Sequence, residues 1–393
     1  MTTIALIGAN GHGKWHRRRI AELQAAGRVR LVALADVQPV EAADVPVFTD
    51  HRELLAAARP DVVVICTPPH THLSIAVDAL TAGCDVLLEK PPVPTLAEHA
   101  TLLAAVHESG RACQVGFQAL GSTASAQFNH AIGAGALGPV TALAAIGSWR
   151  RDDAYYARAR WAGRRSVDGR PVLDGALVNP LAHALMQGLV AAAAAGAGQP
   201  VRLEAERYRT REIEVDDTAF ARISFAGGLR MTIAVTLAGE EFIPGEIIVT
   251  GATGRAELEY PTDRLALPGD PARLAVPGRA DLLENLLDHR GDPRRVALLC
   301  PLEQTAAFTS VVEALTAPGQ PLPALLAGPE VTPVGAGAER IQVIEGINAV
   351  LRQSATTARL PSELGVGWAV PPLTADLGPV GVSERARSAP GRG

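Results

Sequence analysis

The first 120 residues alternate short apolar segments with segments of helical periodicity. The apolar segments are continuous rather than interrupted by polar residues, and they lie at residues 4–7, 31–35, 62–66, 86–88 and 112–117. Strands of this kind are buried on both faces, as in a parallel sheet that helices cover on both sides. The pattern therefore predicts an α/β domain with a doubly wound parallel sheet over residues 1–120.

Beyond residue 120 the strand candidates become longer, and apolar and polar residues alternate along them. They lie at residues 140–149, 201–208, 218–225, 229–237, 246–250 and 255–260. Several are separated only by short glycine turns, which is typical of antiparallel strands. We expect a second, α+β domain over residues 121–370. Residues 371–393 are rich in Pro, Gly, Ser and Arg with few large apolar residues, and we expect a disordered tail there.

Composition and charge exclude several classes of protein. An apolar content of 48% with a mean hydropathy of +0.15 is enough for sizeable cores, so a wholly disordered chain is excluded. The 36 cationic and 41 anionic side chains give a net charge of −5, which provides no positive field to hold nucleic acid or an anionic membrane. We therefore expect small-molecule or protein partners, with no nucleic acid and no membrane among them.

The cysteines and the apolar segments indicate the compartment. The four cysteines are Cys66, Cys84, Cys113 and Cys300. They form no C-x-x-C pair and have no metal-ligand spacing, as is usual in a reducing compartment. The apolar run before residue 8 is too short for a secretion signal, and the one at residues 188–198 is too short to span a bilayer. We expect a soluble, cytoplasmic protein.

The first predicted strand runs directly into a glycine-rich turn before a helical segment. Glycines at such a turn let a pyrophosphate approach the backbone and the N–H groups at the helix start. Compared with G-x-G-x-x-G, Gly8 and Gly13 match, whereas Asn10 occupies the middle glycine position and Gly11 follows one residue late. The motif alone is weak, so a glycine-rich turn that binds no ligand stays open as the alternative.

The second predicted strand is followed by Asp36, 23 residues after Gly13. A carboxylate at this place accepts hydrogen bonds from the adenosine ribose of a dinucleotide. It would repel a 2′-phosphate, and no arginine follows Asp36 immediately, so we expect NAD to be favoured over NADP. The alternative is that Asp36 only begins a turn.

Two further segments follow parallel strands at their carboxyl ends, where an open α/β sheet binds its ligand. One contains Thr67, Pro68 and His72, and the other contains Glu89 and Lys90. Only two of the 36 cationic residues are lysines, so the choice of lysine at position 90 indicates a need for a compact ammonium that can hydrogen-bond a hydroxyl. The alternative is a surface lysine paired with Glu89.

These motifs, together with residues 114–117 (Gln-Val-Gly-Phe), resemble the Gfo/Idh/MocA oxidoreductase family. The resemblance is specific over residues 1–190 and architectural from there to about residue 350. It implies a Rossmann domain followed by an α+β domain with an open, mostly antiparallel sheet, and assembly into a homodimer or homotetramer through that sheet. The cofactor site that it implies consists of Gly8, Asn10, Gly11, His12, Gly13, Asp36, Thr67, Pro68, His72, Glu89, Lys90 and Gln118.

Asn179 and His183 resemble the family's acid/base motif, an Asp or Asn followed four residues later by His. Asn179 also suits an N-cap, so we expect a helix that begins there and continues through residue 195. His183 would lie in its first turns, where the positive end of the helix disfavours imidazolium and so leaves the ring unprotonated and available as a base near neutral pH. Two points leave a core or capping role open: Met186 stands where the family often has Asp, and a capping Asn179 could not orient His183.

A segment rich in aromatic and arginine residues is a candidate substrate-binding region. It contains Tyr155, Tyr156, Arg158, Arg160 and Trp161, in a chain that is only 4% aromatic. Aromatic faces pack on the C–H surfaces of sugars, and arginines bind carboxylates or hydroxyls. A contact between subunits or a purely structural loop is equally consistent with this composition.

The sequence indicates no chemical role for four other histidines or for the Asp-Gly and Gly-Asp pairs. His12, His16, His70 and His130 have no partners at metal-ligand spacing, so they are interpreted as solvated or capping residues and no metal site is expected. The Asp-Gly and Gly-Asp pairs are interpreted as turns.

The leading hypothesis from the sequence is an NAD-dependent dehydrogenase that acts on a secondary hydroxyl of a sugar, polyol or related compound. Lys90, Asn179 and His183 would be its catalytic residues. One alternative is a regulator of the same fold that binds NAD(P) and a sugar without turnover, because the fold alone does not fix the function. Another is an enzyme that retains its cofactor through a cycle of oxidation and reduction.

Overall fold

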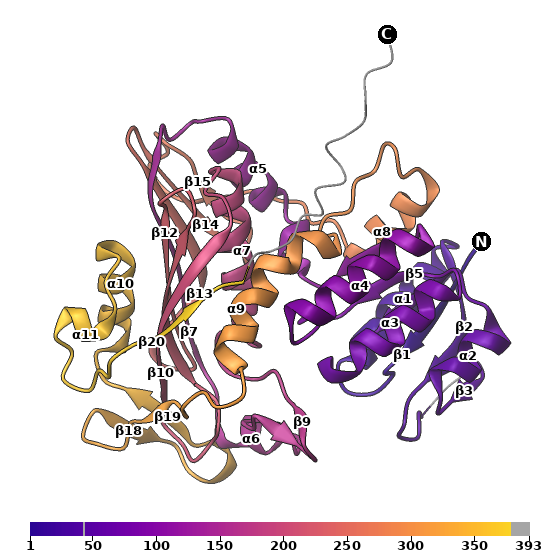
Figure 1. Ribbon diagram of the computed structural model, residues 1–393, viewed down its shortest axis with the longest axis horizontal. Helices are drawn as coiled ribbons and strands as arrows, with labels where there is room; N and C mark the ends of the chain where they lie inside the picture. Colours follow the sequence, from indigo (N-terminus) through magenta and orange to yellow (C-terminus); the bar gives the residue numbers. More distant parts are fainter. Residues whose placement is uncertain (42–43, 379–393) are drawn as a thin grey trace.

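The structure is a computed structural model that describes residues 1–41 and 44–378. It contains two main β-sheets, one near each end of the molecule (Figure 1). The six-stranded sheet is formed by the N-terminal part of the chain, and the ten-stranded sheet by the remainder. The predicted fold class, a doubly wound parallel sheet followed by a mostly antiparallel α+β domain, is confirmed.

The N-terminal sheet has the strand order β3-β2-β1-β4-β5-β6, and every neighbouring pair is parallel. This order brings the carboxyl ends of β1 and β4 together at the point where the strand order reverses, which is where such sheets bind ligands. The strands are β1 (Thr2–Ile7), β2 (Val29–Ala35), β3 (Val47–Phe48), β4 (Val62–Ile65), β5 (Asp85–Leu88) and β6 (Cys113–Val115).

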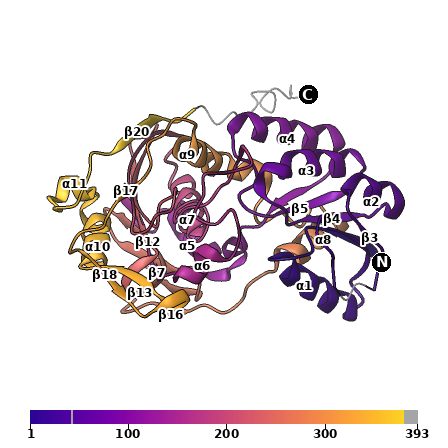
Figure 2. The same cartoon turned by 90° about the horizontal axis from the view of Figure 1, so that it is seen from below.

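Helices cover both faces of this sheet. Successive strand residues point to opposite faces, and on each face apolar side chains pack against helices. Ala5 and Ile7 pack with helices α2, α3 and α4, whereas Ile4 and Leu6 pack with α1 and α8. Figure 2 shows α3 and α4 on one side of the strands and α1 and α8 on the other. The helices are α1 (Gly13–Ala25), α2 (His51–Ala58), α3 (His72–Thr81), α4 (Leu96–Ser109) and α8 (Leu282–Gly291). Since α8 comes from far along the chain, the N-terminal layer includes residues outside 1–120.

The second sheet is mostly antiparallel, with the order β16-β15-β14-β13-β7-β12-β11-β10-β17 and with β20 also paired to β10. Two pairs are parallel, β7 with β12 and β10 with β17. The glycine turns at residues 227–228 and 251–254 join antiparallel strands, as predicted. The strands are β7 (Val140–Arg150), β10 (Pro200–Arg209), β11 (Thr218–Phe225), β12 (Arg230–Thr236), β13 (Ala238–Gly251), β14 (Arg255–Glu259), β15 (Arg264–Ala266), β16 (Leu274–Ala275), β17 (Ala324–Leu325) and β20 (Leu373–Asp376).

Both faces of the second sheet are covered. Helices α5 (Thr123–Gly133), α7 (Ala182–Ala194) and α9 (Ala306–Thr316) lie between this sheet and the N-terminal domain, and α10 (Ile347–Thr357) and α11 (Pro361–Leu364) lie on the far side (Figure 1). Ile347, Leu351 and Leu360 pack there against Ile146 and Phe220 of the strands. Assembly of copies through this sheet stays a prediction, and on this face a second copy would meet α10 and α11 before the strands.

Two small hairpins complete the domain. One consists of β8 (Ser166–Val167) and β9 (Arg170–Pro171), close to α6 (Asp153–Ala157), and the other of β18 (Val331–Val334) and β19 (Ile341–Ile344). Short 3₁₀ turns occur at Pro69–Thr71, Gln118–Gly121, Leu302–Thr305 and Gly337–Glu339.

The predicted disordered tail is wrong for its first residues. Leu373–Asp376 form β20, which pairs antiparallel with β10, and Leu377 is 8% exposed within the main core. Backbone pairing with an edge strand and one buried leucine are enough to order this short stretch. Residues 379–393 lie outside the described residues, and the domain boundaries stay predictions. No helix in the described ranges is long and apolar enough to cross a membrane.

Candidate active site

The glycine-rich turn joins β1 to α1 and is shaped by close approaches of the backbone. Gly8 has φ +88°, and a Cβ on it would lie 2.4 Å from the Cys66 carbonyl oxygen. A Cβ on Gly13 would lie 1.9 Å from the Gly8 carbonyl oxygen, so the start of α1 packs directly on the turn. Gly11 has φ +53° with open space where its Cβ would be. The turn therefore leaves room at the N-terminus of α1, which fits the pyrophosphate of a dinucleotide.

Asp36 lies beside this turn, at the end of β2. One carboxylate oxygen accepts a hydrogen bond from the Asn10 backbone N–H at 2.9 Å, and the other accepts one from the Gln38 N–H at 2.9 Å. Asp36 therefore both begins a turn and lies next to the glycine motif. Its position fits the ribose of a dinucleotide whose pyrophosphate lies over Gly11.

Glu89, at the end of β5, is buried and bonded to the first turn of α1. Its Oε1 lies 2.8 Å from His16 Nε2 and 3.6 Å from His12 Nε2, and its Oε2 accepts from the Lys90 N–H at 3.1 Å. Burial raises the pKa of Glu89, but the hydrogen bond from His16 and the nearby His12 ring outweigh this effect and hold the pKa well below its usual range. A side chain at Gly116 would press on this carboxylate, because its Cβ would lie 3.0 Å away.

The interpretation of His16 as a solvated or capping residue is wrong. His16 is 2% exposed, and His12, His16 and Glu89 bring three possible metal-ligand atoms within 4.8 Å of one another. The two histidines lie four residues apart, on the same side of the first turn of α1, and Glu89 reaches them from the end of β5. The hydrogen bond between His16 Nε2 and Glu89 needs no ion, and His16 Nδ1 is buried without a partner. The expected absence of a metal stays a prediction.

Four other predicted cofactor residues lie around the same loops. His72 is fully buried, with Nε2 at 2.8 Å from the Thr67 carbonyl oxygen and Nδ1 at 3.0 Å from the carbonyl oxygens of Pro91 and Pro92. His72 thus joins the loops after β4 and β5, and its contribution to a cofactor site stays a prediction. Thr67 accepts a hydrogen bond from the Thr71 hydroxyl, and Pro68 precedes a 3₁₀ turn. Gln118 lines a small cavity together with His16 and Glu89.

Lys90 points from the N-terminal domain towards the segment that precedes α7. Its ammonium donates to the Asn179 side-chain oxygen at 2.9 Å and to the Asn179 carbonyl oxygen at 3.1 Å. Burial lowers the pKa of Lys90, while the carboxylates of Glu89 and Asp174 act in the opposite direction. The alternative of a surface lysine paired with Glu89 is therefore wrong, because only the Lys90 backbone bonds that side chain.

The predicted capping role of Asn179 is also wrong. Helix α7 begins at Ala182, its N-cap is Leu181, and no side chain caps it. The Asn179 amide instead accepts from Lys90 and donates to Asp174 Oδ1 at 3.1 Å. Asn179 therefore does not cap α7, and its side chain is available to bind Lys90. Met186, where the resembled family often has an Asp, is 1% exposed in the core.

His183 lies in the first turn of α7, between aromatic rings. The Phe117 ring meets it edge-on at 5.7 Å between centroids, and the Tyr260 ring lies at 6.5 Å. Burial and the nearby Lys90 ammonium lower its pKa to about 3. The ring is therefore neutral at physiological pH and able to accept a proton. Its Nδ1 is buried without a hydrogen-bond partner.

The structure divides the predicted substrate residues into two groups. The Arg158 guanidinium lies between the Tyr155 ring at 3.6 Å and the Trp161 ring at 4.5 Å. Burial and the carboxylate of Asp174 raise the pKa of Tyr155. Tyr156 and Arg160 instead line a separate pocket.

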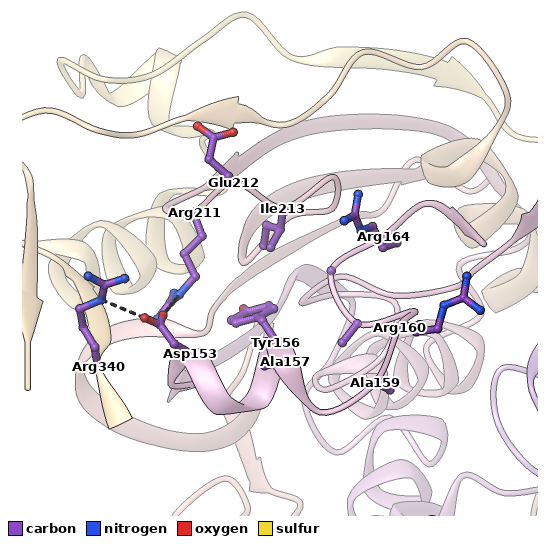
Figure 3. Close-up of a pocket in the computed structure, with 12 residues that line it drawn as sticks. Asp153, Tyr156, Ala157, Ala159, Arg160, Arg164, Arg211, Glu212, Ile213 and Arg340 are labelled. Atoms are coloured by element: carbon purple, nitrogen blue, oxygen red, sulfur yellow. Dashed lines mark hydrogen bonds and ion pairs between the residues drawn. The ribbon is translucent and has the colours of Figure 1, made fainter. Parts of the chain in front are cut away.

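That pocket has a volume of about 460 Å³, and neither Lys90 nor His183 lines it. Arg211 and Arg340 converge on Asp153 at 2.9 Å each, with Tyr156 beside them (Figure 3). Arg160 and Arg164 extend along the other side of the pocket (Figure 3). Most of the charged side chains that line this pocket already form ion pairs. The pocket is separate from the candidate active site.

Sequence reasoning missed two polar residues of the site, His16 and Asp174. A histidine four residues after another at a helix start was a usable signal for His16. Asp174 precedes Gly175 and was interpreted only as part of a turn, although it is 4% exposed. Its contacts come from residues that are distant in the sequence, so no local pattern points to it.

Comparison with known proteins agrees with these features. The family profile described as "Oxidoreductase family, NAD-binding Rossmann fold" (GFO_IDH_MocA) matches residues 2–117. Inositol 2-dehydrogenase 2 of Paenarthrobacter aurescens is 28% identical over 173 residues, 43% of this chain and 44% of that protein. Inositol 2-dehydrogenase 1 of Saccharopolyspora erythraea is 31% identical over 142 residues, 34% of this chain and 42% of that protein. The matched region thus spans less than half the length of these relatives.

Similarity of fold extends over most of the chain. The WlbA dehydrogenase from Bordetella pertussis, solved with NADH and UDP-GlcNAcA, has a TM-score of 0.66 at 22% identity, over 83% of this chain and 99% of that one. An inositol dehydrogenase homologue from Azotobacter vinelandii, solved with NADH and myo-inositol, has a TM-score of 0.62 at 20% identity, over 80% and 94%. The profile thus identifies residues 2–117 as a Rossmann domain of the Gfo/Idh/MocA oxidoreductase family, and the solved structures show that most of the chain shares their fold.

Proposed function

We propose that this protein is an NAD-dependent dehydrogenase that interconverts a secondary hydroxyl and a ketone of a sugar, polyol or sugar-like compound. The observation that supports this most strongly is the convergence of Lys90, Asn179 and a neutral His183 beyond the carboxyl ends of the parallel strands. A dinucleotide fits the turn at Gly8, Gly11 and Gly13 and supplies the hydride acceptor.

Each residue at this site has a distinct task. The Lys90 ammonium, held by two oxygens of Asn179, has a third N–H with which it can bind the substrate oxygen and stabilise negative charge on it. His183 accepts the hydroxyl proton as the carbonyl forms. Because Nδ1 is buried, we assign that proton to Nε2.

Three observations support the choice of substrate class and cofactor. Tyr155 and Trp161 form an aromatic cluster around Arg158, and its chemistry is of the kind that packs on sugars. Relatives named inositol 2-dehydrogenase match the N-terminal region. Asp36 beside the glycine turn favours NAD over NADP, because its charge repels a 2′-phosphate.

The test is to incubate the protein with NAD and a panel of sugars, inositols and glycosides while following the absorbance of reduced nicotinamide. We expect turnover of at least one polyol or glycoside. If NAD binds but no compound on a broad panel reacts, the dehydrogenase proposal fails and the regulator hypothesis takes its place. If reduced nicotinamide forms once per protein molecule and is not released, the enzyme retains its cofactor.

A further inference from the structure

Asp174 is a buried carboxylate whose two oxygens reach different parts of the active-site surroundings. Oδ1 accepts from the Asn179 side-chain N–H at 3.1 Å, and Oδ2 accepts from the Gly163 backbone N–H at 2.9 Å. The next residue, Gly175, has φ +115°, and its Cβ would lie 3.0 Å from the Asp216 carboxylate. The backbone that positions Asp174 therefore requires a glycine at position 175.

The contact with Asp174 fixes the orientation of the Asn179 amide. A carboxylate only accepts hydrogen bonds, so it selects the orientation in which the amide N–H group faces Asp174. The amide oxygen then faces Lys90, which donates to it at 2.9 Å. In the flipped orientation the amide N–H group would face the ammonium and the amide oxygen would face the carboxylate. Both the Lys90 ammonium and the Asp174 carboxylate would then lose a hydrogen-bond partner.

Few titratable groups lie near Lys90 in the described part of the chain. Glu89 precedes it on the same loop, Cys66 follows β4, Asp174 precedes α7, and His183 lies on α7. Burial raises the pKa of the Cys66 thiol and lowers that of His183, so both are neutral at physiological pH. Glu89 and Asp174 remain as the carboxylates that offset the cost of an ammonium in this partly buried place.

We propose that Asp174 is a positioning residue for Lys90: it orients the Asn179 amide and supplies, through that amide, a carboxylate that keeps the lysine charged and in place. The same carboxylate holds Gly163, two residues beyond Trp161, so it also fixes the end of the aromatic segment (residues 155–161) relative to the lysine. The consequence for catalysis rests on the proposed dehydrogenase function.

The small number of lysines allows a direct test without a substrate. Biosynthetic labelling with ¹³C-lysine gives one Cε signal for Lys14 and one for Lys90, because the chain has no other lysine. The Lys14→Arg variant assigns them. The pH dependence of the Lys90 signal is then measured in the full-length wild type and in Asp174→Asn.

We expect Asp174→Asn to lower the pKa of Lys90 by about one pH unit, the effect of losing a nearby opposite charge, while the Lys14 signal is unchanged. Asp216→Asn is the matched control, since this carboxylate is also buried close to Gly175, and among the described residues no hydrogen bond joins it to Asn179 or Lys90; it should leave the Lys90 pKa unchanged. An unchanged Lys90 pKa in folded Asp174→Asn, or an equal change in Asp216→Asn, would overturn the proposal.

A relocated carboxylate separates positioning from general damage to the structure. In the double variant Asp174→Asn/Asn179→Asp the acceptor and donor exchange places, so the carboxylate contacts Lys90 directly. The Lys90 pKa should return to the wild-type value or exceed it. If Asp174→Asn alone does not fold, this variant decides: a pKa at or above wild type supports the proposal, and a lower one overturns it.

Turnover distinguishes this proposal from the proposed function. Given a substrate, Asp174→Asn should lower kcat by on the order of tenfold with NAD affinity unchanged, and the double variant should restore it. A shifted Lys90 signal without turnover in any protein, the wild type included, supports the positioning role and contradicts the dehydrogenase. Turnover with equal kcat in wild type and Asp174→Asn contradicts the positioning role alone.

Discussion

The two halves of the candidate active site are built in different ways. On the cofactor side, the turn from Gly8 to Gly13 is one continuous segment, and its shape is set by glycines whose side chains would collide with nearby backbone. On the other side, Lys90 binds Asn179, 89 residues away, and Asn179 in turn binds Asp174. One half is determined by local backbone geometry, and the other by tertiary contacts between polar side chains.

This difference has a physical consequence for substitutions. A local turn that is tightly packed fails when a single atom is added, whereas a network of polar side chains fails when a partner is removed and its neighbour is left unsatisfied. The first kind of damage should reduce folding stability and cofactor binding together. The second should reduce catalysis while cofactor binding is retained.

The largest effect is expected from removal of the reacting groups. Lys90→Met and His183→Ala should each lower kcat by on the order of 10² or more, because each removes a positioned acid, base or polarising group. Lys90→Arg should also fail, since a guanidinium is larger and too weak an acid to replace the ammonium. NAD affinity, measured by calorimetry, should stay close to wild type. Wild-type turnover in Lys90→Met and His183→Ala would show that these residues are structural.

The local half of the site was largely predictable from the sequence. The glycines, Asp36 and the order of strand and helix follow from short motifs and from continuous apolar segments, which depend on neighbours in the chain. The prediction for Asn179 was wrong because an asparagine before a helical segment favours capping in isolation. Nothing local indicates that Lys90 binds the oxygen of its amide and Asp174 the amide N–H group.

The next largest effect distinguishes two glycines of the same turn. Gly13→Ala should lower the free energy of unfolding by more than about 2 kcal/mol and abolish most NAD binding, because the added Cβ would lie 1.9 Å from the Gly8 carbonyl oxygen. Gly11→Ala adds a methyl group in open space and should cost only about 1 kcal/mol for its positive φ. Urea denaturation and calorimetry measure both quantities. Equal losses in the two variants would mean that backbone conformation, rather than close packing, controls the turn.

The outer parts of the C-terminal domain show a second limit of sequence reasoning. Apolar alternation located β7 and β10–β14, but not the strands at the edge of the sheet, which have two to four residues each. Leu373–Asp376 has few large apolar side chains, so its composition favours a tail, and it is ordered by backbone pairing with β10. Likewise, no periodicity in the sequence states that α10 packs on the face of the sheet opposite α7.

A smaller effect concerns the choice of cofactor on the local side. Asp36→Ala should lower NAD affinity by about tenfold and narrow the difference between NAD and NADP, because it removes both a ribose acceptor and the charge that repels a 2′-phosphate. Asp36 also binds the Asn10 and Gln38 backbone N–H groups, so Asp36→Asn, which retains one acceptor, is the control for damage to the turn. It should improve NADP binding with a smaller loss for NAD. Equal affinities for NAD and NADP in the wild type would contradict the assignment.

The smallest effect concerns the dependence of stability on pH on the catalytic side. Burial and Lys90 lower the pKa of His183 from 6.5 to about 3 in the folded protein, so between these values the unfolded chain binds more protons than the folded one. The contribution of His183 to stability is therefore complete above pH 6.5 and is lost as the pH falls. Between pH 7 and 5.5 this loss should be about 1 kcal/mol, and His183→Gln should remove it from the pH dependence of urea unfolding.

The matched control is His130→Gln, an exposed histidine on α5, which should leave the pH dependence unchanged. If His183→Gln unfolds with the same pH dependence as the wild type, the ring is not held neutral by its surroundings. The acid limb of the activity profile gives an independent reading of the same group, since a neutral His183 remains a competent base well below pH 6.5. A decline in kcat/KM centred near pH 6.5 would show that the ring titrates as it does in water, and that the burial between Phe117 and Tyr260 has no effect on its chemistry.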